Sequence, residues 1–147
     1  MQSILARLRD HRQPVDILGL HGASTALLLA RAVEALQRSL CCILPADDQL
    51  EVLARDIAFF SRVPVLTYPS YEIPPYTPLS PDPATVCARL ATLYRLRENR
   101  SPCIVLTSAE AVLRRILPAA ELDRRCELVL AGEETDRDSL IASLVAS

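Results

Sequence analysis

Short apolar runs alternate with longer amphipathic stretches along most of the chain. Such apolar runs predict strands, and the run Leu40–Leu44, which is closed by Pro45, is typical of a strand covered on both faces. The stretches between them repeat their apolar residues at helical spacing, which predicts helices. The expected strands are residues 15–20, 40–44, 63–68 and 103–107.

Start and stop signals place helices between these strands. Capping sequences occur at Asp82-Pro83, Asp48-x-x-Glu51 and Thr135-x-x-Asp138. Further helices are expected at residues 2–10, 23–39 and 109–116, and a last strand candidate at residues 127–131. The alternation predicts an α/β fold class, with a mostly parallel sheet flanked by helices on both faces.

A proline-rich stretch separates the third expected strand from the helix that follows it. Seven of the 11 prolines lie between Pro64 and Pro83. Proline removes backbone donors and fixes φ, so this segment is expected to run as a stiff, extended loop. Its P-x-x-P patterns allow two interpretations. The loop either wraps the edge of a domain or serves as a recognition peptide.

The helix that begins at Pro83 carries both apolar and basic positions. Its expected buried stripe is Val86, Leu90, Leu93 and Leu96. Its arginines are Arg89, Arg95, Arg97 and Arg100, for which a solvated face is expected. The alternative is a DNA-binding patch formed by these four arginines with Arg114 and Arg115. Affinity that falls steeply with salt would identify such a patch.

Two of the three glycines, Gly19 and Gly22, lie between the first expected strand and the first long helix. A glycine turn in this setting is similar to the phosphate-binding loop, G-x-x-x-x-G-K-[ST]. Gly19 then takes the place of the first glycine and Ser24 that of the last, while Thr25 replaces the lysine and Ala26 the Ser/Thr. All 16 basic side chains are arginine, so the chain has no lysine for the phosphates. Ala26 likewise offers no hydroxyl to Mg²⁺.

The candidate cofactor-binding residues are therefore Gly19, Gly22, Ser24 and Thr25, in a degenerate phosphate loop that we expect to be inactive. No catalytic residue and no metal ligand is predicted. The alternative is a nucleotide-binding domain that uses Ser24, Thr25 and the helix dipole in place of lysine. Hydrolysis by such a site would be very slow, because no cation would stabilise the developing charge.

Composition excludes several classes of function. The formal net charge of −2 argues against a globally basic nucleic-acid binder. The five cysteines include no C-x-x-C, and neither histidine stands at ligand spacing, so disulfides and metal sites are not expected. This cysteine usage favours a reduced, cytoplasmic compartment. No apolar stretch approaches the roughly 20 residues of a membrane span.

Three stretches together resemble one family. They read GLHGASTALLLA, ILPADDQLEVLARDIAFF and YPSYEIPPYTPLSPDPATVCARLATLYRL, and TSAEAVLRRILP continues the match. The family is the bacterial transcription-repair coupling factor (Mfd), and the similar part is its N-terminal module. That module is itself similar to the first domain of the excinuclease subunit UvrB, which has a RecA-like fold with a working phosphate loop. The resemblance covers the chain from about residue 15 to its end.

The resemblance implies a domain organisation and a set of partners. Residues 1–123 would form a UvrB-like, degenerate RecA-like domain, and residues 124–147 the start of a second, UvrA-binding type of domain. The whole protein would be an ATP-dependent DNA translocase with ATP and Mg²⁺ on its motor domains, and it would contact UvrA, RNA polymerase and double-stranded DNA.

This chain itself would be non-catalytic and would bind no cofactor and no membrane. It would help to present the UvrA-binding surface and, through contacts with other domains, hold it closed until the motor engages stalled RNA polymerase. Its compact loop at residues 69–81 is too short for the DNA-clamping hairpin of UvrB.

Overall fold

The computed structural model describes residues 2–10, 13–74, 76–98, 101–125, 129, 131–132 and 134–146. The chain forms two compact units, Met1–Arg114 and Arg115–Ser147. The elements of the first unit are α1 (Gln2–Asp10), α2 (Ala23–Leu36), β1 (Leu40–Leu44), the short 3₁₀ helix η1 (Asp47–Gln49), α3 (Leu50–Phe60), β2 (Val65–Tyr68), α4 (Pro83–Glu98), β3 (Ile104–Ser108) and α5 (Ala109–Leu113). The second unit contains α6 (Ala119–Arg125) and α7 (Arg137–Ala146).

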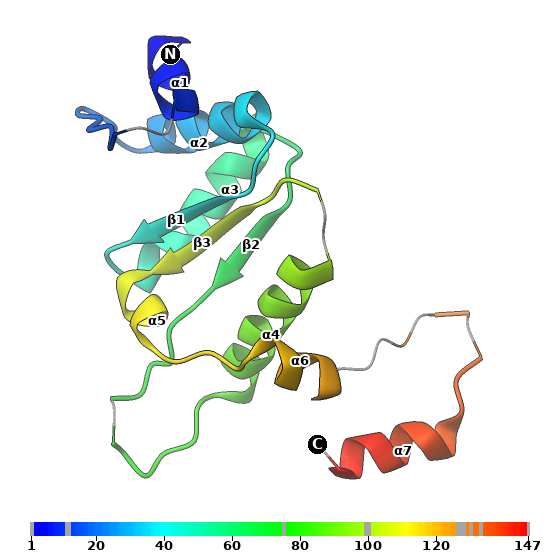
Figure 1. Ribbon diagram of the computed structural model, residues 1–147. Coiled ribbons are helices and arrows are strands. Elements are labelled where there is room, and N and C mark those ends of the chain that lie inside the picture. The colour runs from blue at the N-terminus through cyan, green and yellow to red at the C-terminus, as the bar shows by residue number, and fades with distance from the viewer. Residues whose placement is uncertain are drawn as a thin grey trace. The chain divides into compact units, whose positions relative to one another are not determined.

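The first unit is built on a three-stranded parallel sheet with strand order β1-β3-β2 (Figure 1). Ile104 of β3 stands opposite Leu40 of β1 and Val65 of β2. The expected α/β class is confirmed, and three of the four expected strands form within two residues of their predicted bounds. The parallel arrangement follows because helices carry the chain back between successive strands.

The strand expected at residues 15–20 is wrong. This segment has no regular secondary structure, and Leu18 is 93% exposed. Gly19 takes a φ of +81°, which lies outside the extended region and interrupts a strand before its expected end. Asp16 and Gly19 are also poor strand formers, and an apolar run alone does not secure a place beside another strand.

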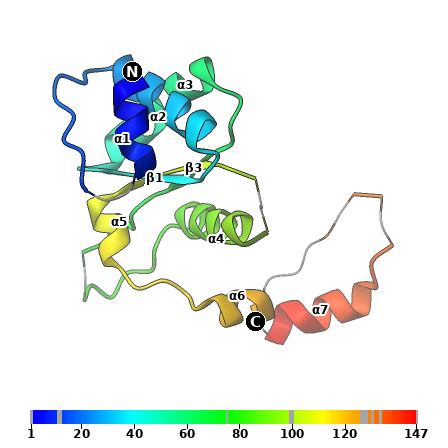
Figure 2. The ribbon, with the colours of Figure 1, turned by 45° about the horizontal axis from the view of Figure 1, so that its top comes forward.

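One face of the sheet carries the apolar core. Helices α2 and α3 pack against each other and α3 packs on the sheet, with α1 beside α2 (Figure 2). Arg9 of α1 donates a hydrogen bond of 3.0 Å to the carbonyl of Ala35. The buried core comprises Ala26, Val33, Leu50, Leu53, Ile57, Ile104 and Leu106. The apolar pattern of the first long helix therefore predicted the burial of α2 correctly. The helix is shorter than the predicted residues 23–39, because it ends at Leu36.

Helix α4 lies on the opposite face of the sheet and contacts β2 (Figure 2). The stripe expected to be buried on it is buried only in part: Val86, Leu90 and Leu93 are half-buried and Leu96 is exposed. The buried residues of α4 are Arg89 and Thr92. The Oγ1 of Thr92 donates to the carbonyl of Thr67 at 2.6 Å. Hydrophobic periodicity cannot identify such a contact, because polar residues bury readily only where the facing strand supplies hydrogen-bond partners.

Coverage of this second face is incomplete. Among the described helices, α4 makes its principal sheet contacts with β2. Cys41 and Ile43 of β1 alternate with Leu40, Cys42 and Leu44, which pack against the core. Cys41 and Ile43 remain exposed, Ile43 by 56%. Helices therefore flank both faces of the sheet, as expected. On the second face, however, the described helices leave the β1 side chains Cys41 and Ile43 exposed to solvent.

The capping predictions had mixed outcomes. Asp82 caps α4 as predicted, because its carboxylate accepts a 2.9 Å hydrogen bond from the amide of Thr85. The capping box at Asp48 is wrong, since Asp48 lies inside η1 and the N-cap of α3, Gln49, makes no side-chain capping bond. The helix expected at residues 109–116 is shorter and ends at Leu113.

The second unit is described by itself. Helix α6 was not expected. Residues 127, 128 and 130 of the last strand candidate lie outside the described residues, and residues 129 and 131 are not in a strand. Asp136, rather than Thr135, caps α7 by accepting hydrogen bonds from the amide of Asp138 at 3.2 Å and the hydroxyl of Ser139 at 2.6 Å. The division into domains at residue 123 stays a prediction. Within the described part of the chain, no helix is long and apolar enough to cross a membrane.

Candidate functional site

The glycine turn is the first candidate site. Gly19 and Gly22 have φ angles of +81° and +52°, and Gly22 is the N-cap of α2. The Ser24 hydroxyl accepts from the amide of His21 and donates to the carbonyl of His21, both at 2.8 Å. The amides of Ser24 and Thr25 donate to His21 and Gly22 at 3.2 and 3.3 Å. The amides of Ser24 and Thr25 and the hydroxyl of Ser24, which could donate hydrogen bonds to a phosphate, are thus already bonded within the turn.

A cavity of about 380 Å³ lies beside this turn. Of the four candidate residues, Gly22 and Thr25 line it, whereas Gly19 and Ser24 are not part of its lining. Its other lining residues are Leu20, His21, Leu44, Asp48, Gln49, Val52, Leu53 and Asp56. The lining residues that the structure describes include two carboxylates and no arginine, so the electrostatics are unfavourable for an anion.

Ala26 stands where a phosphate loop has the Ser or Thr hydroxyl that binds Mg²⁺, and its surroundings are equally unsuited to binding a metal ion. Ala26 is 0% exposed and belongs to the apolar core, so its side chain cannot reach a ligand. Within the described residues, no group of three or more His, Cys, Asp or Glu side chains could hold a metal ion. Cys41, Cys42, Cys87 and Cys103 are free cysteines. Cys126 lies outside the described part of the chain.

A second candidate site lies at the carboxyl end of the sheet, where Arg89 of α4 meets the end of β2. Arg89 is 2% exposed and donates 2.6 Å to the hydroxyl of Tyr68. It also donates to the carbonyl of Pro69 at 2.5 Å. Its guanidinium carbon lies 4.0 Å from the ring centroid of Tyr68 and 4.2 Å from that of Tyr71. Such desolvated cation–π contacts are among the stronger ones in proteins.

Asp47 of η1 holds the next residue of the loop. Its Oδ2 accepts 2.6 Å from the amide and 2.8 Å from the hydroxyl of Ser70. Its Oδ1 and the Nε of Arg89 are buried and have no hydrogen-bond partner within the described residues. Burial raises the pKa of Asp47, but the Ser108 hydroxyl, the two bonds from Ser70 and the charge of Arg89 outweigh it and hold the pKa below its ordinary value.

Arg114, which follows α5, holds the loop further along. Its guanidinium donates 2.5 Å to the carbonyl of Ile73 and pairs at 3.3 Å with Glu110. It also lies 5.9 Å from the ring centroid of Tyr71. We call Asp47, Arg89 and Arg114 the clamp, and residues 69–82 the proline-rich loop. The expected loop is confirmed by its described residues, none of which lies in a helix or strand. It is not extended throughout, because Tyr76 takes a φ of +66°.

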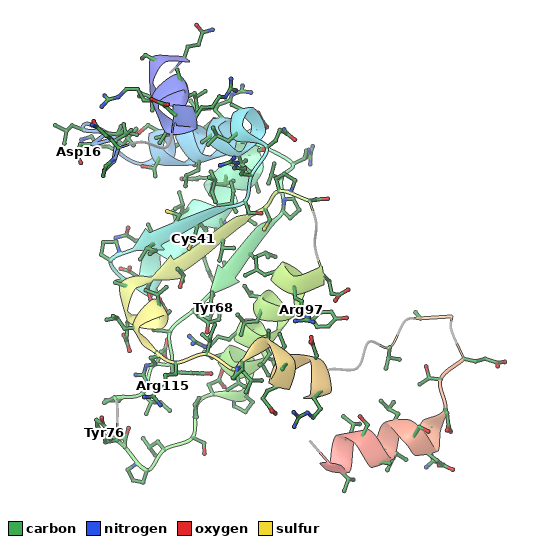
Figure 3. The ribbon with its side chains drawn as sticks, in the orientation of Figure 1. Asp16, Cys41, Tyr68, Tyr76, Arg97 and Arg115 are labelled. Atoms are coloured by element: carbon green, nitrogen blue, oxygen red, sulfur yellow. The ribbon has the colours of Figure 1, made fainter. Side chains whose placement is uncertain are left out.

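The clamp fixes one end of the loop and leaves its tip in solvent. Tyr68 lies where β2 meets α4, whereas Tyr76 lies at the outer end of the loop (Figure 3). Tyr76 is 105% and Leu79 66% exposed. The polar groups of the clamp are largely engaged with the loop, with Tyr68 and with Glu110. This arrangement suits it to shaping the loop rather than to acid–base or nucleophilic chemistry.

The sequence indicated the loop but not the clamp. The solvated face expected for Arg89 is wrong, and its burial removes it from the alternative DNA-binding patch. Arg114 is likewise engaged with Ile73 and Glu110. Arg95 and Arg97 are exposed, while Arg100 lies outside the described residues. The sequence signal that could have indicated the clamp was Tyr68 and Tyr71, at the start of the loop, because tyrosine rings are good cation–π acceptors.

Fold and sites together define a small α/β module with a three-stranded parallel sheet and a clamped loop. No protein-family model matches the chain. The chain is 37% identical, over 141 residues, to a transcription-repair-coupling factor of Myxococcus xanthus. It is therefore related to a module of the transcription-repair-coupling factors, which confirms the resemblance seen in its sequence. The match covers 90% of this chain and 12% of the relative, so the chain spans about an eighth of the relative's length.

Proposed function

We propose that this chain is the non-catalytic, UvrB-like module of a cytoplasmic transcription-repair coupling factor. In the whole protein it would help to recruit UvrA and to keep the enzyme autoinhibited. The similarity to a coupling factor supports the family setting. The observation that carries the non-catalytic role is the cavity beside the glycine turn, whose described lining residues include Asp48 and Asp56 and no arginine.

The other activities of the family belong, in this proposal, to parts of the protein outside this chain. Motor domains elsewhere would bind ATP and Mg²⁺ and move on double-stranded DNA, and another domain would contact RNA polymerase. A RecA-like origin of this module is part of the proposal. It is supported by the parallel sheet and by two glycines of positive φ immediately before α2.

The test of this function is deletion of residues 1–147 from the full-length protein. Binding of purified UvrA should weaken strongly, and the basal ATPase rate should rise about tenfold, the size of a typical coupling energy between sites. DNA-stimulated ATPase activity serves as the control, because the motor domains remain intact. Unchanged UvrA binding together with an unchanged basal ATPase rate would contradict the proposal.

A separate prediction concerns nucleotide. Calorimetric titration of the chain with ATP and Mg²⁺ should show no binding heat, because the turn lacks a cation and Asp48 and Asp56 repel phosphate. Thr25→Lys alone should not restore binding, since the new ammonium would pair with these carboxylates. Adding Asp48→Asn and Asp56→Asn tests that explanation. Micromolar affinity of the natural chain would show that the turn is a working nucleotide site.

A further inference from the structure

The tip of the proline-rich loop is an exposed apolar knob. Tyr76 and Leu79, three residues apart, are 105% and 66% exposed. Tyr76 takes a φ of +66°, the left-handed region that a bulky residue adopts at a cost. Backbone strain of this kind is concentrated at functional sites, where the surrounding structure maintains it.

Both ends of the loop are held, so its described part is preorganised. The clamp bonds Pro69 to α4, Ser70 to η1 and Ile73 to Arg114, the residue that follows α5. At the other end Asp82 caps α4, which anchors the loop to a long helix. Proline at several positions further restricts the unbound chain. A preorganised loop loses little conformational entropy when it binds, which favours recognition.

The charge of the loop selects the chemistry of its partner. Residues 69–82 include the acidic residues Glu72 and Asp82 and no basic residue. A nucleic-acid backbone would be repelled by this segment. A protein surface with an apolar pocket and a border of arginine or lysine side chains would be complementary to it. Tyrosine is also enriched among the residues that dominate protein interfaces.

The small area of the knob indicates that the complementary surface belongs to the same polypeptide and not to a separate protein. One aromatic side chain buries about 150–250 Å². Two side chains therefore fall well below the roughly 800 Å² per partner of a stable complex between separate proteins. Within one polypeptide, linkage raises the effective concentration to the millimolar range, and a small contact then suffices.

We propose that Tyr76 and Leu79 dock into an apolar pocket with a basic border on a later region of the same polypeptide. The inference rests on the proposed function, because it requires this chain to be one module of a longer coupling factor. It identifies a specific surface for the intramolecular contact, in which the clamp presents the knob and the pocket receives it. Release of this contact would free the module from the rest of the protein.

The test uses photo-crosslinking in the full-length protein, with p-benzoylphenylalanine in place of Tyr76. The matched control carries the same group in place of Phe59, an aromatic residue of α3 that is 84% exposed. Illumination and peptide mass spectrometry should give an intramolecular cross-link from position 76 to a region beyond residue 147, flanked by apolar and basic residues. Leu79→Ser should reduce its yield several-fold, and position 59 should give no such product.

Three results would overturn the inference. They are no cross-link from position 76, equal cross-linking from positions 76 and 59, and a cross-link that forms only when purified UvrA is added. The deletion experiment above tests the proposed function independently. Loss of UvrA binding on deletion, without a cross-link from position 76, would remove this inference alone. A cross-link combined with normal UvrA binding and normal basal ATPase after deletion would remove the proposed function alone.

Discussion

Arg89→Ala is expected to lower the free energy of unfolding by about 3–5 kcal/mol, the range found when one partner of a buried charged contact is removed. The variant loses hydrogen bonds to the Tyr68 hydroxyl and the Pro69 carbonyl, and contacts with two aromatic rings. It also leaves a void beneath α4, where Arg89 is 2% exposed. Urea unfolding of the chain at pH 7, followed by circular dichroism, measures the change.

Two variants control this result. Arg95→Ala changes an exposed arginine of the same helix and should alter stability by less than about 0.5 kcal/mol. Arg89→Lys retains the charge but cannot reproduce the planar, forked geometry, so it should recover only part of the loss. If Arg89→Ala were as stable as Arg95→Ala, the contacts of Arg89 would contribute nothing to the stability of the fold.

Asp47→Ala is expected to cost about 2 kcal/mol, because it removes two hydrogen bonds to a charged acceptor. It also leaves the amide of Ser70, a residue only 7% exposed, without that acceptor. The same urea titration measures this loss. Asp48→Ala is the matched control, since Asp48 is exposed and makes no capping bond at α3.

The contribution of Asp47 should depend on pH. Burial raises its pKa, but the hydroxyl of Ser108, the bonds from Ser70 and the charge of Arg89 reverse that effect, so the folded-state pKa is lowered. The unfolded state therefore binds the proton more readily, with a pKa of about 3.9. The stabilisation is complete above that value and is lost as the pH falls through the lower, folded pKa.

The comparison with Asp47→Asn isolates this effect. The amide keeps the shape of the side chain but does not titrate. The stability difference between Asp47 and Asp47→Asn should therefore be constant near pH 7 and shrink below about pH 4. A difference that stays constant down to pH 2 would show that Asp47 does not titrate differently in the folded and unfolded states.

The sequence by itself determined the local elements. The run Leu40–Leu44 became β1 with the predicted bounds, and Asp82 became the cap of α4. Both depend on neighbouring residues: a short apolar run ended by proline, and an aspartate before Pro83. The glycine turn also has the positive φ angles that glycine permits. The family resemblance rested on such stretches and did not require the arrangement of elements in space.

The tertiary structure alone decided which partners the ambiguous segments found. Residues 15–20 have the apolar content of a strand, but pairing needs a free neighbour and an extended backbone, and Gly19 departs from it. Arg89 has the sequence setting of a solvated residue, yet it is buried between β2 and the start of the proline-rich loop. The free-energy cost of burying this cation is offset by hydrogen-bond acceptors and aromatic rings of residues about 20 positions away in the sequence. Periodicity along one helix carries no information about those residues.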